Sequence, residues 1–355
     1  MYYVTLVTVT SKDNNNSVTS KNMAPEWVPE AEDRQGRVKG LFGSERLYNG
    51  IASVNPSGLW MPKTFKENAE KIYNFEVKPD DVWIITYPKC GTTWAQEMIW
   101  LILNQANFEE AKQINGMERI PYLEFQALNN LQELKAKAAE GKAPPLPQSL
   151  LDAMTKEEHT LKMAEDLPSP RTIKSHLPLE FLPPKLLDTC KVVFVGRNPK
   201  DACVSFYHFC QQLPNVQYKG DFEQFMNLFI HGDVLYGNYW TMIRSAWNHR
   251  NHPNLKILWY ENMKVNMIPI IEEVAQFLGK HLTKLKILEI DDFLYIDNFR
   301  QLYSTKTPSG ESKSLLVRKG KVGGWKEYMT NEDNLKKWND WAAKNSQGIG
   351  FDIKY

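Results

Sequence analysis

The chain has 355 residues, of which 42% are hydrophobic and 24% are charged, a composition that is ordinary for a globular protein with a large core. The formal net charge is +1, so no global field attracts nucleic acid or an anionic membrane. Any anion-binding site must therefore be local.

The cysteines and the N-terminal residues indicate in which cellular compartment the protein is expected. Four cysteines match neither a CxxC metal pair nor a dense disulfide framework, which favours free thiols in a reducing compartment. The N-terminal residues lack the basic segment and the small-residue cleavage site of a signal peptide. No stretch approaches the roughly 18 apolar residues that span a bilayer. We therefore expect a cytoplasmic protein without a membrane-inserted segment.

Residues 1–40 are predicted to form a disordered arm. They contain "SKDNNNSVTSKN" and few large apolar residues, so burial cannot offset the entropy of ordering them. No Gly/Ser-rich linker divides the chain after residue 60. Residues 41–355 are therefore predicted to form one domain.

The first regular elements are predicted between residues 63 and 105. Residues 63–74 have the pattern of a short amphipathic helix, and "VWIITY" at 82–87 is an apolar run typical of a buried parallel strand. After a glycine turn, "TTWAQEMIWLILNQ" at 92–105 has the pattern of a mostly buried helix. A strand, a tight turn and a helix are thus expected in that order.

Residues 126–166 are rich in Ala, Lys, Glu and Gln and contain "APPLP" in the middle. This composition predicts helical surface segments that flank a mobile loop. A long excursion of this kind is more often a lid or a substrate wall than a domain.

The strand and helix pattern then repeats. "KVVFVGR" at 191–197 predicts a buried strand, and 202–213 a helix. "KILWYENM" at 256–263 predicts a third strand with its crossover, 268–279 an amphipathic helix closed by glycine, and 331–347 a final helix. This alternation predicts an α/β fold, a single domain with a central parallel sheet flanked by helices.

The turn in "TYPKCGTTW" at 86–94 is predicted to bind phosphate. A strand that opens a helix in this way presents successive backbone N–H groups and the positive helix end to an anion. Gly91 lets the backbone approach closely, and Thr92 and Thr93 add hydroxyl donors. These residues alone also fit a plain turn with a glycine dihedral and a threonine cap. Lys89 favours the phosphate site, since in a plain turn it would only be a solvated charge.

The order of the loop differs from that of nucleoside triphosphatases. Their loop is G-x-x-x-x-G-K-[ST], with lysine after the last glycine, whereas Lys89 lies two residues before Gly91. The strand at 191–197 ends in Gly196 and Arg197, where a magnesium-binding strand would end in Asp. The sequence therefore predicts a P-loop-like site that uses fixed cations in place of a metal.

Four separated motifs resemble those of the cytosolic sulfotransferases, over roughly residues 60–330. They are "YPKCGTTW" at 87–94, "PSPRTIKSHLP" at 168–178, "VVFVGRNPKDACVSFYHF" at 192–209 and "RKGKVGGWK" at 318–326. The resemblance implies 3′-phosphoadenosine 5′-phosphosulfate as the donor, with no metal. It implies transfer of the sulfuryl group to a hydroxyl or amine of a small lipophilic acceptor such as a phenol or a sterol.

The resemblance assigns three side chains to the transfer. His176 would be the general base, because an imidazole with a pKa near neutrality can accept the proton of the acceptor. Lys89 would neutralise the charge that builds on the leaving phosphate. Lys174, two residues before His176 in a strand, would point to the same side and add positive charge. Without the resemblance, His176 would be read as a structural histidine.

The resemblance also implies a set of donor-binding residues. Arg197 and Ser205, eight residues apart, would converge on the 3′-phosphate, with the guanidinium giving bidentate contact. Trp94 and Tyr260 would lie at the adenine, although both could be ordinary packed residues. The full set is Lys89, Cys90, Gly91, Thr92, Thr93, Trp94, Arg197, Ser205, Tyr260, Arg318, Lys319 and Gly320.

The acceptor is expected to meet aromatic side chains as well as Lys174 and His176. Candidates are Tyr122, Phe125 and Phe209, with Phe206 in the same segment, although these aromatics could equally belong to the core.

The chain departs from the family in several places. Cys90 replaces a serine, and a thiol at a helix N-terminus is expected to be acidic and oxidisable. Gly324 replaces the Asp of "GDWK", which puts the local turn in doubt. The adenine-side segment is not recognisable and corresponds by position to 294–296. Only Lys326 and Thr330 remain of the short dimer motif, so a homodimer is left open.

Two other functions stay open. A protein that keeps the nucleotide site but sequesters a lipophilic ligand would need no turnover. A P-loop kinase would transfer phosphate from ATP with magnesium, which the loop order argues against. A sulfated allylic alcohol also carries a good leaving group, so with such an acceptor the net reaction would be dehydration.

Overall fold

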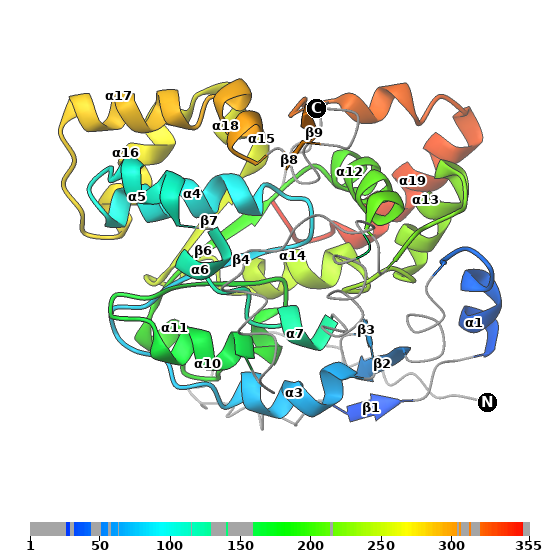
Figure 1. Ribbon diagram of the computed structural model, residues 1–355. Helices are drawn as coiled ribbons and strands as arrows, with labels where there is room; N and C mark the ends of the chain where they lie inside the picture. Colours follow the sequence, from blue (N-terminus) through cyan, green and yellow to red (C-terminus); the bar gives the residue numbers. More distant parts are fainter. Residues whose placement is uncertain are drawn as a thin grey trace, which may run out of the picture.

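The computed structural model describes residues 26–28, 32–43, 51–55, 58–62, 64–114, 116–128, 140, 159–213, 216–303, 305–306, 312–313 and 320–350. Its centre is a parallel sheet whose strands, in spatial order, are β5, β4, β6 and β7 (Figure 1). These strands are β4 (Val82–Thr86), β5 (Thr172–Ser175), β6 (Lys191–Gly196) and β7 (Leu255–Trp259). The predicted α/β class with a central parallel sheet is confirmed.

The third predicted strand and the start of its crossover are both present at 256–263. β7 ends at Trp259, and the chain turns directly into the helix α15 (Tyr260–Val265). Trp259 is the last extended residue, with φ −116° and ψ 130°. The helix takes up "YENMKV", whose Glu, Met and Lys favour helical backbone. Tyr260 therefore begins a helix at the carboxyl edge of the sheet.

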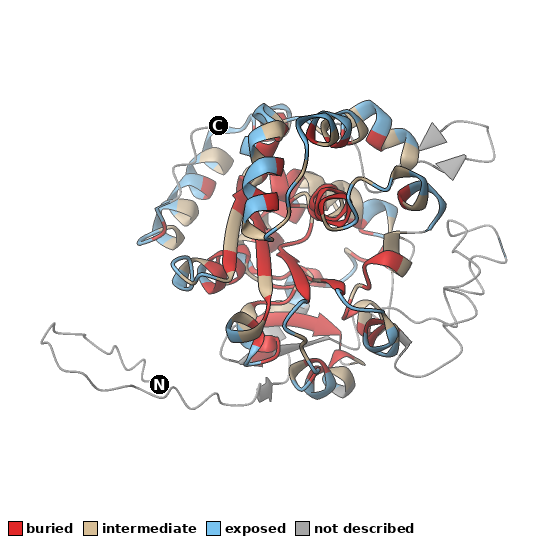
Figure 2. Cartoon of the chain, turned by 90° about the vertical axis from the view of Figure 1, so that its left-hand side faces the viewer, coloured by how far each residue is buried: buried red, intermediate tan, exposed pale blue. Residues whose placement is uncertain are grey.

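Helices cover both faces of the sheet (Figures 1 and 2). Alternation along the strands sends Ile84, Val193 and Val195 to one hydrophobic cluster and Trp83, Ile85 and Phe194 to the other. The first cluster includes residues of α4 (Thr92–Leu103), α16 (Met267–Phe277), α17 (Lys284–Phe293) and α18 (Ile296–Leu302). The second includes residues of α3 (Thr64–Tyr73), α12 (Pro199–Gln212), α13 (Phe222–His231), α14 (Tyr239–Asn248) and α19 (Glu332–Asn345).

The shorter elements complete the described structure. Three of them, β1 (Glu26–Val28), β2 (Ile51–Asn55) and β3 (Leu59–Pro62), form an antiparallel sheet. The other helices are α1 (Glu32–Val38), α5 (Phe108–Gln113), α6 (Gly116–Arg119), α7 (Phe125–Leu128), α10 (His159–Asp166) and α11 (Leu186–Thr189). The remaining elements are a two-stranded pair, β8 (Thr305–Lys306) with β9 (Ser312–Lys313), and two short 3₁₀ turns, η1 (Leu179–Phe181) and η2 (Gly324–Glu327).

Part of the predicted disordered arm is folded. In α1, Arg34 and Arg37 each form an ion pair of 2.5 Å with Asp233, whose side chain is buried, and Val38 is 4% exposed. Burial of Val38 and the shared carboxylate anchor this helix on the domain. Residues 1–25 lie outside the described residues.

The excursion at 126–166 is described only near its two ends. Thr160 in α10 donates a hydrogen bond of 3.2 Å to the carbonyl of Leu123, and Thr64 in α3 donates one of 2.7 Å to Ala127 in α7. Its ends therefore pack on the domain. Most of the predicted lid lies outside the described residues.

A buried ion pair fixes the start of β4 and β5. Arg171 donates from Nε to Asp81 Oδ1 at 2.7 Å and from Nη2 to Oδ2 at 2.6 Å, and both side chains are at most 1% exposed. Asp81 lies just before β4 and Arg171 just before β5. The pair therefore fixes the register that brings the far ends of the two strands together.

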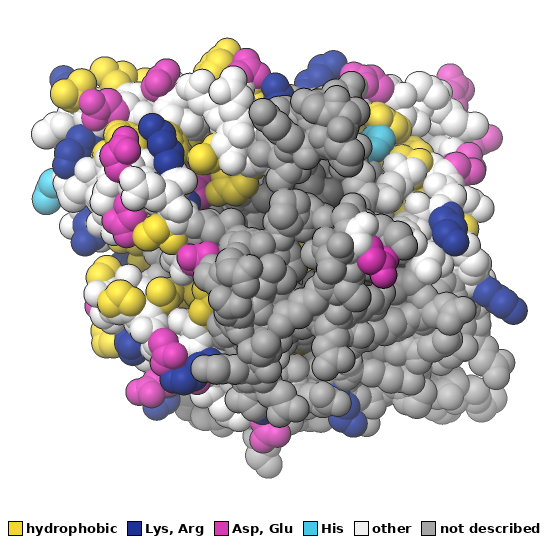
Figure 3. Space-filling view, viewed as in Figure 1, with side chains coloured by type: hydrophobic (Ala, Val, Ile, Leu, Met, Phe, Trp, Pro, Cys, Tyr) yellow, Lys and Arg dark blue, Asp and Glu magenta, His cyan; other side chains and the backbone are white. Residues whose placement is uncertain are grey.

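Charges of both signs are intermingled on the described surface in Figure 3, in line with the net charge near zero. Among the described residues, no helix combines the length and the apolar character needed to cross a membrane.

Candidate functional site

The predicted site residues meet where β4, β5 and β6 end. Thr86 ends β4, His176 follows β5 and Arg197 follows β6. The carboxyl edge of a parallel sheet is where α/β proteins place ligands, because the loops there converge. The sheet thus gathers residues that are 21 to 111 positions apart in the sequence.

The loop from β4 to α4 has the conformation of an anion cradle. Lys89 and Gly91 both have left-handed backbone, with φ of 68° and 98°, and Gly91 precedes the first residue of α4. Alternating backbone of this kind turns successive N–H groups toward one point. A Cβ on Gly91 would lie 2.7 Å from Cδ2 of Tyr260. Glycine is therefore needed both for its dihedral angle and for space.

His176 is held with one nitrogen committed. Its Nδ1 lies 2.8 Å from the carbonyl oxygen of Thr86 and 3.0 Å from the hydroxyl of the same residue. A carbonyl can only accept, so Nδ1 carries the proton and Nε2 is the basic nitrogen. Burial, together with the nearby charge of Lys174, lowers the pKa of His176 to about 3. The imidazole is therefore neutral at pH 7, and its pKa is lower than the near-neutral value expected from the sequence.

Glu124 holds the backbone of His176 through a hydrogen bond. The sequence analysis did not predict this residue. Its Oε1 accepts the backbone N–H of His176 at 2.6 Å and the hydroxyl of Tyr236 at 3.3 Å, and the residue is fully buried. Burial raises the pKa of Glu124 to about 7. An acidic residue inside the apolar run "IPYLEF" was the signal that could have found it.

Two tyrosines flank the imidazole. The rings of Tyr122 and Tyr236 lie edge-on to His176, with centroids at 5.1 and 5.5 Å, and their hydroxyls bond to each other. Tyr122 was predicted for the acceptor side. Tyr236 was missed, because a single tyrosine before a "GN" turn carries no spacing signal.

Both predicted lysines lie against aromatic rings of the predicted acceptor wall. Lys174 Nζ is 4.6 Å from the ring centroid of Tyr122 and 3.4 Å from Gln96 Oε1. Lys89 Nζ is 4.1 Å from the ring centroid of Phe209. Burial lowers the pKa of Lys174 to about 8. Two cations thus lie near the edges of a largely apolar site.

Arg197 joins the cradle to Tyr260. Its Nη1 donates to the carbonyl of Lys89 at 2.9 Å, and its guanidinium lies 4.2 Å from the ring centroid of Tyr260. Its Nε is buried and has no hydrogen-bond partner among the described residues. Trp94, 8% exposed, packs on Tyr260 and donates from Nε1 to the carbonyl of Leu294 at 2.9 Å.

The C-terminal loop is tied to α12 by Asp201, which sequence reasoning also missed. Its carboxylate accepts the backbone N–H groups of Gly323 at 2.7 Å and Trp325 at 3.0 Å. The turn whose form was in doubt is therefore made with Gly324 in place. Ser205 lies one helical turn after Asp201, on α12.

Gly320 has φ of 60°, and a Cβ there would lie 2.6 Å from Ile296 Cδ1. Ile296 belongs to the segment 294–296 that was predicted by position. Gly320 therefore rests directly on α18. Arg318 and Lys319 lie outside the described residues.

One expectation from the sequence is wrong, and one alternative that it left open is decided. Cys90 is fully buried, and burial raises the pKa of its thiol, so it is not the acidic, oxidisable thiol that was expected. Phe206 is 2% exposed and packs edge-on against Tyr87 and Phe225 in the core. Phe209, one turn later on α12, packs on the same cluster but is only partly buried, and its ring contacts Lys89.

Comparison with known proteins gives one consistent result. The sequence model of the sulfotransferase domain matches residues 79–350. The chain is 32% identical over 280 residues to sulfotransferase 4A1 of Homo sapiens, covering 79% of this chain and 85% of that protein. It is 31% identical over 295 residues to luciferin sulfotransferase of Photinus pyralis, covering 79% and 76%.

Solved structures agree with this result. A retinol dehydratase in complex with androsterone and the inactive cofactor PAP superposes with a TM-score of 0.80 at 26% identity, covering 94% of this chain and 99% of that one. The complex of retinol dehydratase with retinol and PAP gives 0.79 at 27% identity, with the same coverage.

Proposed function

The chain belongs to the sulfotransferase family, and from that premise we propose that His176, Lys89 and Lys174 carry sulfuryl transfer from 3′-phosphoadenosine 5′-phosphosulfate to a small lipophilic acceptor. The observation that carries the proposal is the pairing of His176 Nδ1 with the Thr86 carbonyl at 2.8 Å. This contact holds a neutral imidazole at the strand end that opens the phosphate cradle. A base and an anion site therefore share one strand terminus.

The residues present fit a nucleotide that bears phosphates. The left-handed backbone at Lys89 and Gly91 forms a tight loop at the N-terminus of α4, and the partial positive charge of that helix end points at the loop. The buried Nε of Arg197 has an unused N–H next to the same loop. Trp94 and Tyr260 offer aromatic rings on which the adenine of the donor could stack. When bound, the donor supplies the sulfuryl group.

Each side chain has a distinct task in this scheme. His176 Nε2 takes the proton from the hydroxyl or amine of the acceptor as that group attacks sulfur. Lys89 offsets the negative charge that grows on the leaving phosphate. Lys174 places a second ammonium on the acceptor side. Glu124 and Thr86 act through His176 as positioning residues, since each holds the ring without meeting the reacting atoms.

A metal-free donor distinguishes this activity from a P-loop kinase. Calorimetric titration with 3′-phosphoadenosine 5′-phosphate in the presence of EDTA is expected to give a dissociation constant in the micromolar range or below. Binding of ATP only, and only with magnesium, would contradict the proposal.

The acceptor is proposed to be lipophilic, because the rings of Tyr122 and Tyr236 pack on His176. Phe125 packs on Tyr122, and Phe209 lies against Lys89. The relatives named for luciferin and for retinol support the same class of acceptor. An acceptor panel of phenols, sterols, allylic alcohols and amines with labelled donor identifies it. The likeness to retinol dehydratase makes dehydration a second outcome to test with an allylic alcohol. Mass spectrometry distinguishes the sulfate ester from the dehydrated product.

The pH dependence gives a separate test of Lys174. Its pKa of about 8 means that the ammonium is charged below pH 8 and neutral above it. We expect kcat/KM of the wild type to fall as the pH rises through about 8, because kcat/KM reports groups of the free enzyme. Lys174→Arg keeps its charge, so its alkaline limb is expected to move to higher pH. An acceptor alcohol that does not titrate is used, and an unchanged limb in the variant would rule out Lys174 as its source.

Several expectations from the sequence stay predictions. These are a cytoplasmic location, a lid made by 126–166, donor contacts from Arg318 and Lys319, and the oligomeric state. Sequestration of a ligand without turnover also stays open, and turnover assays decide it.

A further inference from the structure

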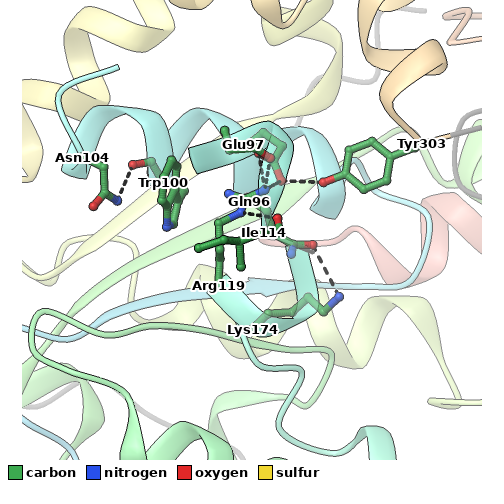
Figure 4. Close-up of polar contacts among 9 residues, drawn as sticks. Gln96, Glu97, Trp100, Asn104, Ile114, Arg119, Lys174 and Tyr303 are labelled. Carbon is green, nitrogen blue, oxygen red and sulfur yellow. Dashed lines mark hydrogen bonds and ion pairs between the residues drawn. The ribbon is translucent and has the colours of Figure 1, made fainter. Parts of the chain in front are cut away.

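A buried polar cluster lies behind the proposed donor site and is not used by the transfer itself. Figure 4 shows Glu97, Arg119 and Tyr303 converging on one helix, α4. Glu97 is fully buried and Arg119 is 7% exposed. Burying a carboxylate and a guanidinium is costly unless each is well paired, so such a cluster calls for an explanation.

The carboxylate of Glu97 is the centre of the cluster. Arg119 Nη2 donates to Glu97 Oε1 at 2.7 Å and to Oε2 at 2.9 Å, and its guanidinium lies 4.5 Å from the ring centroid of Trp100. The hydroxyl of Tyr303 donates to the same Oε1. Burial and the charge of Glu97 raise the pKa of Tyr303, so the phenol stays protonated and remains a donor.

The Tyr303 contact fastens α18 to α4. Trp94 and Glu97 are one turn apart on α4, and they bond to the two ends of the segment 294–303, at the Leu294 carbonyl and the Tyr303 hydroxyl. Between these bonds, Phe299 is buried in the cluster that contains Trp94 and Tyr260. The segment is therefore held at both ends over helix α4.

The segment 294–303 also contacts Gly320, which belongs to the predicted donor-binding set. Ile296 Cδ1 of α18 lies 2.6 Å from the place that a Cβ on Gly320 would take, so Gly320 rests on α18. Any shift of α18 away from α4 would move this support. On the other side, Arg119 precedes Pro121, whose carbonyl accepts the N–H of Lys174 at 3.0 Å. The cluster is thus connected to the donor side of the site through α18 and to the acceptor side through the segment that leads to Pro121.

We propose that Tyr303, anchored by the Glu97–Arg119 pair, is a positioning residue for the donor nucleotide, which it serves by fixing α18 beneath the Gly320 loop and beside Trp94. The inference rests on the proposed function. It assigns to the Tyr303 hydroxyl an effect on donor affinity, with no role in the proton or sulfuryl transfer.

The test is Tyr303→Phe, which removes one hydroxyl and keeps the ring. The dissociation constant of 3′-phosphoadenosine 5′-phosphate, measured by calorimetry, and the donor KM are each expected to rise about tenfold, as for loss of a hydrogen bond to a charged group. The acceptor KM, and kcat at saturating donor, are expected to stay within about twofold. Tyr218→Phe is the matched control, since its hydroxyl donates to the Asp221 carbonyl at 3.2 Å beside Phe42, and it should bind nucleotide like the wild type.

Gly116→Ala probes the same contact without removing a polar group. Its Cβ would lie 3.1 Å from the Tyr303 hydroxyl, so a smaller rise in the same dissociation constant is expected. A merely structural role predicts a lower melting temperature with nucleotide affinity unchanged. Affinity within twofold of the wild type in folded Tyr303→Phe overturns the inference. Failure of the wild type to bind the nucleotide would instead overturn the proposed function.

Discussion

Replacing His176 with alanine is expected to lower kcat/KM for sulfuryl transfer about 10³-fold, the loss typical of a missing general base. The neutral imidazole offers Nε2 as the base because Nδ1 is committed to the Thr86 carbonyl at 2.8 Å. Lys89 and Lys174 are not candidates for the base, because the proposal uses both as positively charged groups. Glu124 is set aside as the base by its position, because its Oε1 accepts the backbone N–H of His176 and the hydroxyl of Tyr236.

The control is His249→Ala. The Nδ1 of His249 lies 2.9 Å from the carbonyl of Ser245, so this ring has the same kind of backbone contact at the end of α14. That variant should keep full activity. Calorimetry with 3′-phosphoadenosine 5′-phosphate should give similar affinities for His176→Ala and the wild type. Transfer by His176→Ala at the wild-type rate would exclude it as the base.

Lys89→Met is expected to lower kcat about 10²- to 10³-fold, as for the loss of one group that stabilises charge in the transition state. Methionine keeps much of the side-chain length over Phe209 and removes only the ammonium. The carbonyl of residue 89 still accepts from Arg197 in this variant, so the loop should keep its shape. Nucleotide affinity is expected to fall much less than kcat.

Lys191→Met is the matched control, because the Lys191 ammonium lies 4.9 Å from the ring centroid of Phe277 at the opposite end of β6. It loses the same kind of contact far from the site and should keep its activity. A loss of nucleotide affinity in Lys89→Met with kcat unchanged at saturating donor would mean that Lys89 only binds the donor and has no special role in the transfer.

The sequence predicted the fold class and the loop because both depend on local patterns. Short apolar runs rich in β-branched residues at 82–87 and 191–197 favour buried strands, and a lysine and a glycine in one turn favour an anion-binding loop. The resemblance added His176, which no local pattern would have chosen. The boundary between β7 and its crossover was not predicted, since the side chains of "WYENM" fit a strand or a helix and the tertiary structure decides between them.

The supporting residues were out of reach for a different reason. Glu124, Asp201 and Tyr236 are single residues whose partners lie up to 124 positions away. The same holds for Tyr303, which is 206 positions from Glu97. Contacts of this kind exist only after the sheet has brought the loops together. Cys90 shows the converse, because a helix N-terminus suggested an acidic thiol and burial reversed the direction of its pKa shift.

The most direct test of the central claim is transfer of labelled sulfate from 3′-phosphoadenosine 5′-phosphosulfate, in EDTA, to the acceptor panel. The account predicts that labelled acceptor, or free sulfate where the product is dehydrated, forms in equal amount with 3′-phosphoadenosine 5′-phosphate. It predicts that His176→Ala and Lys89→Met lose this turnover while still binding nucleotide. Tight binding of nucleotide and ligand by the wild type without any turnover across the panel would contradict it.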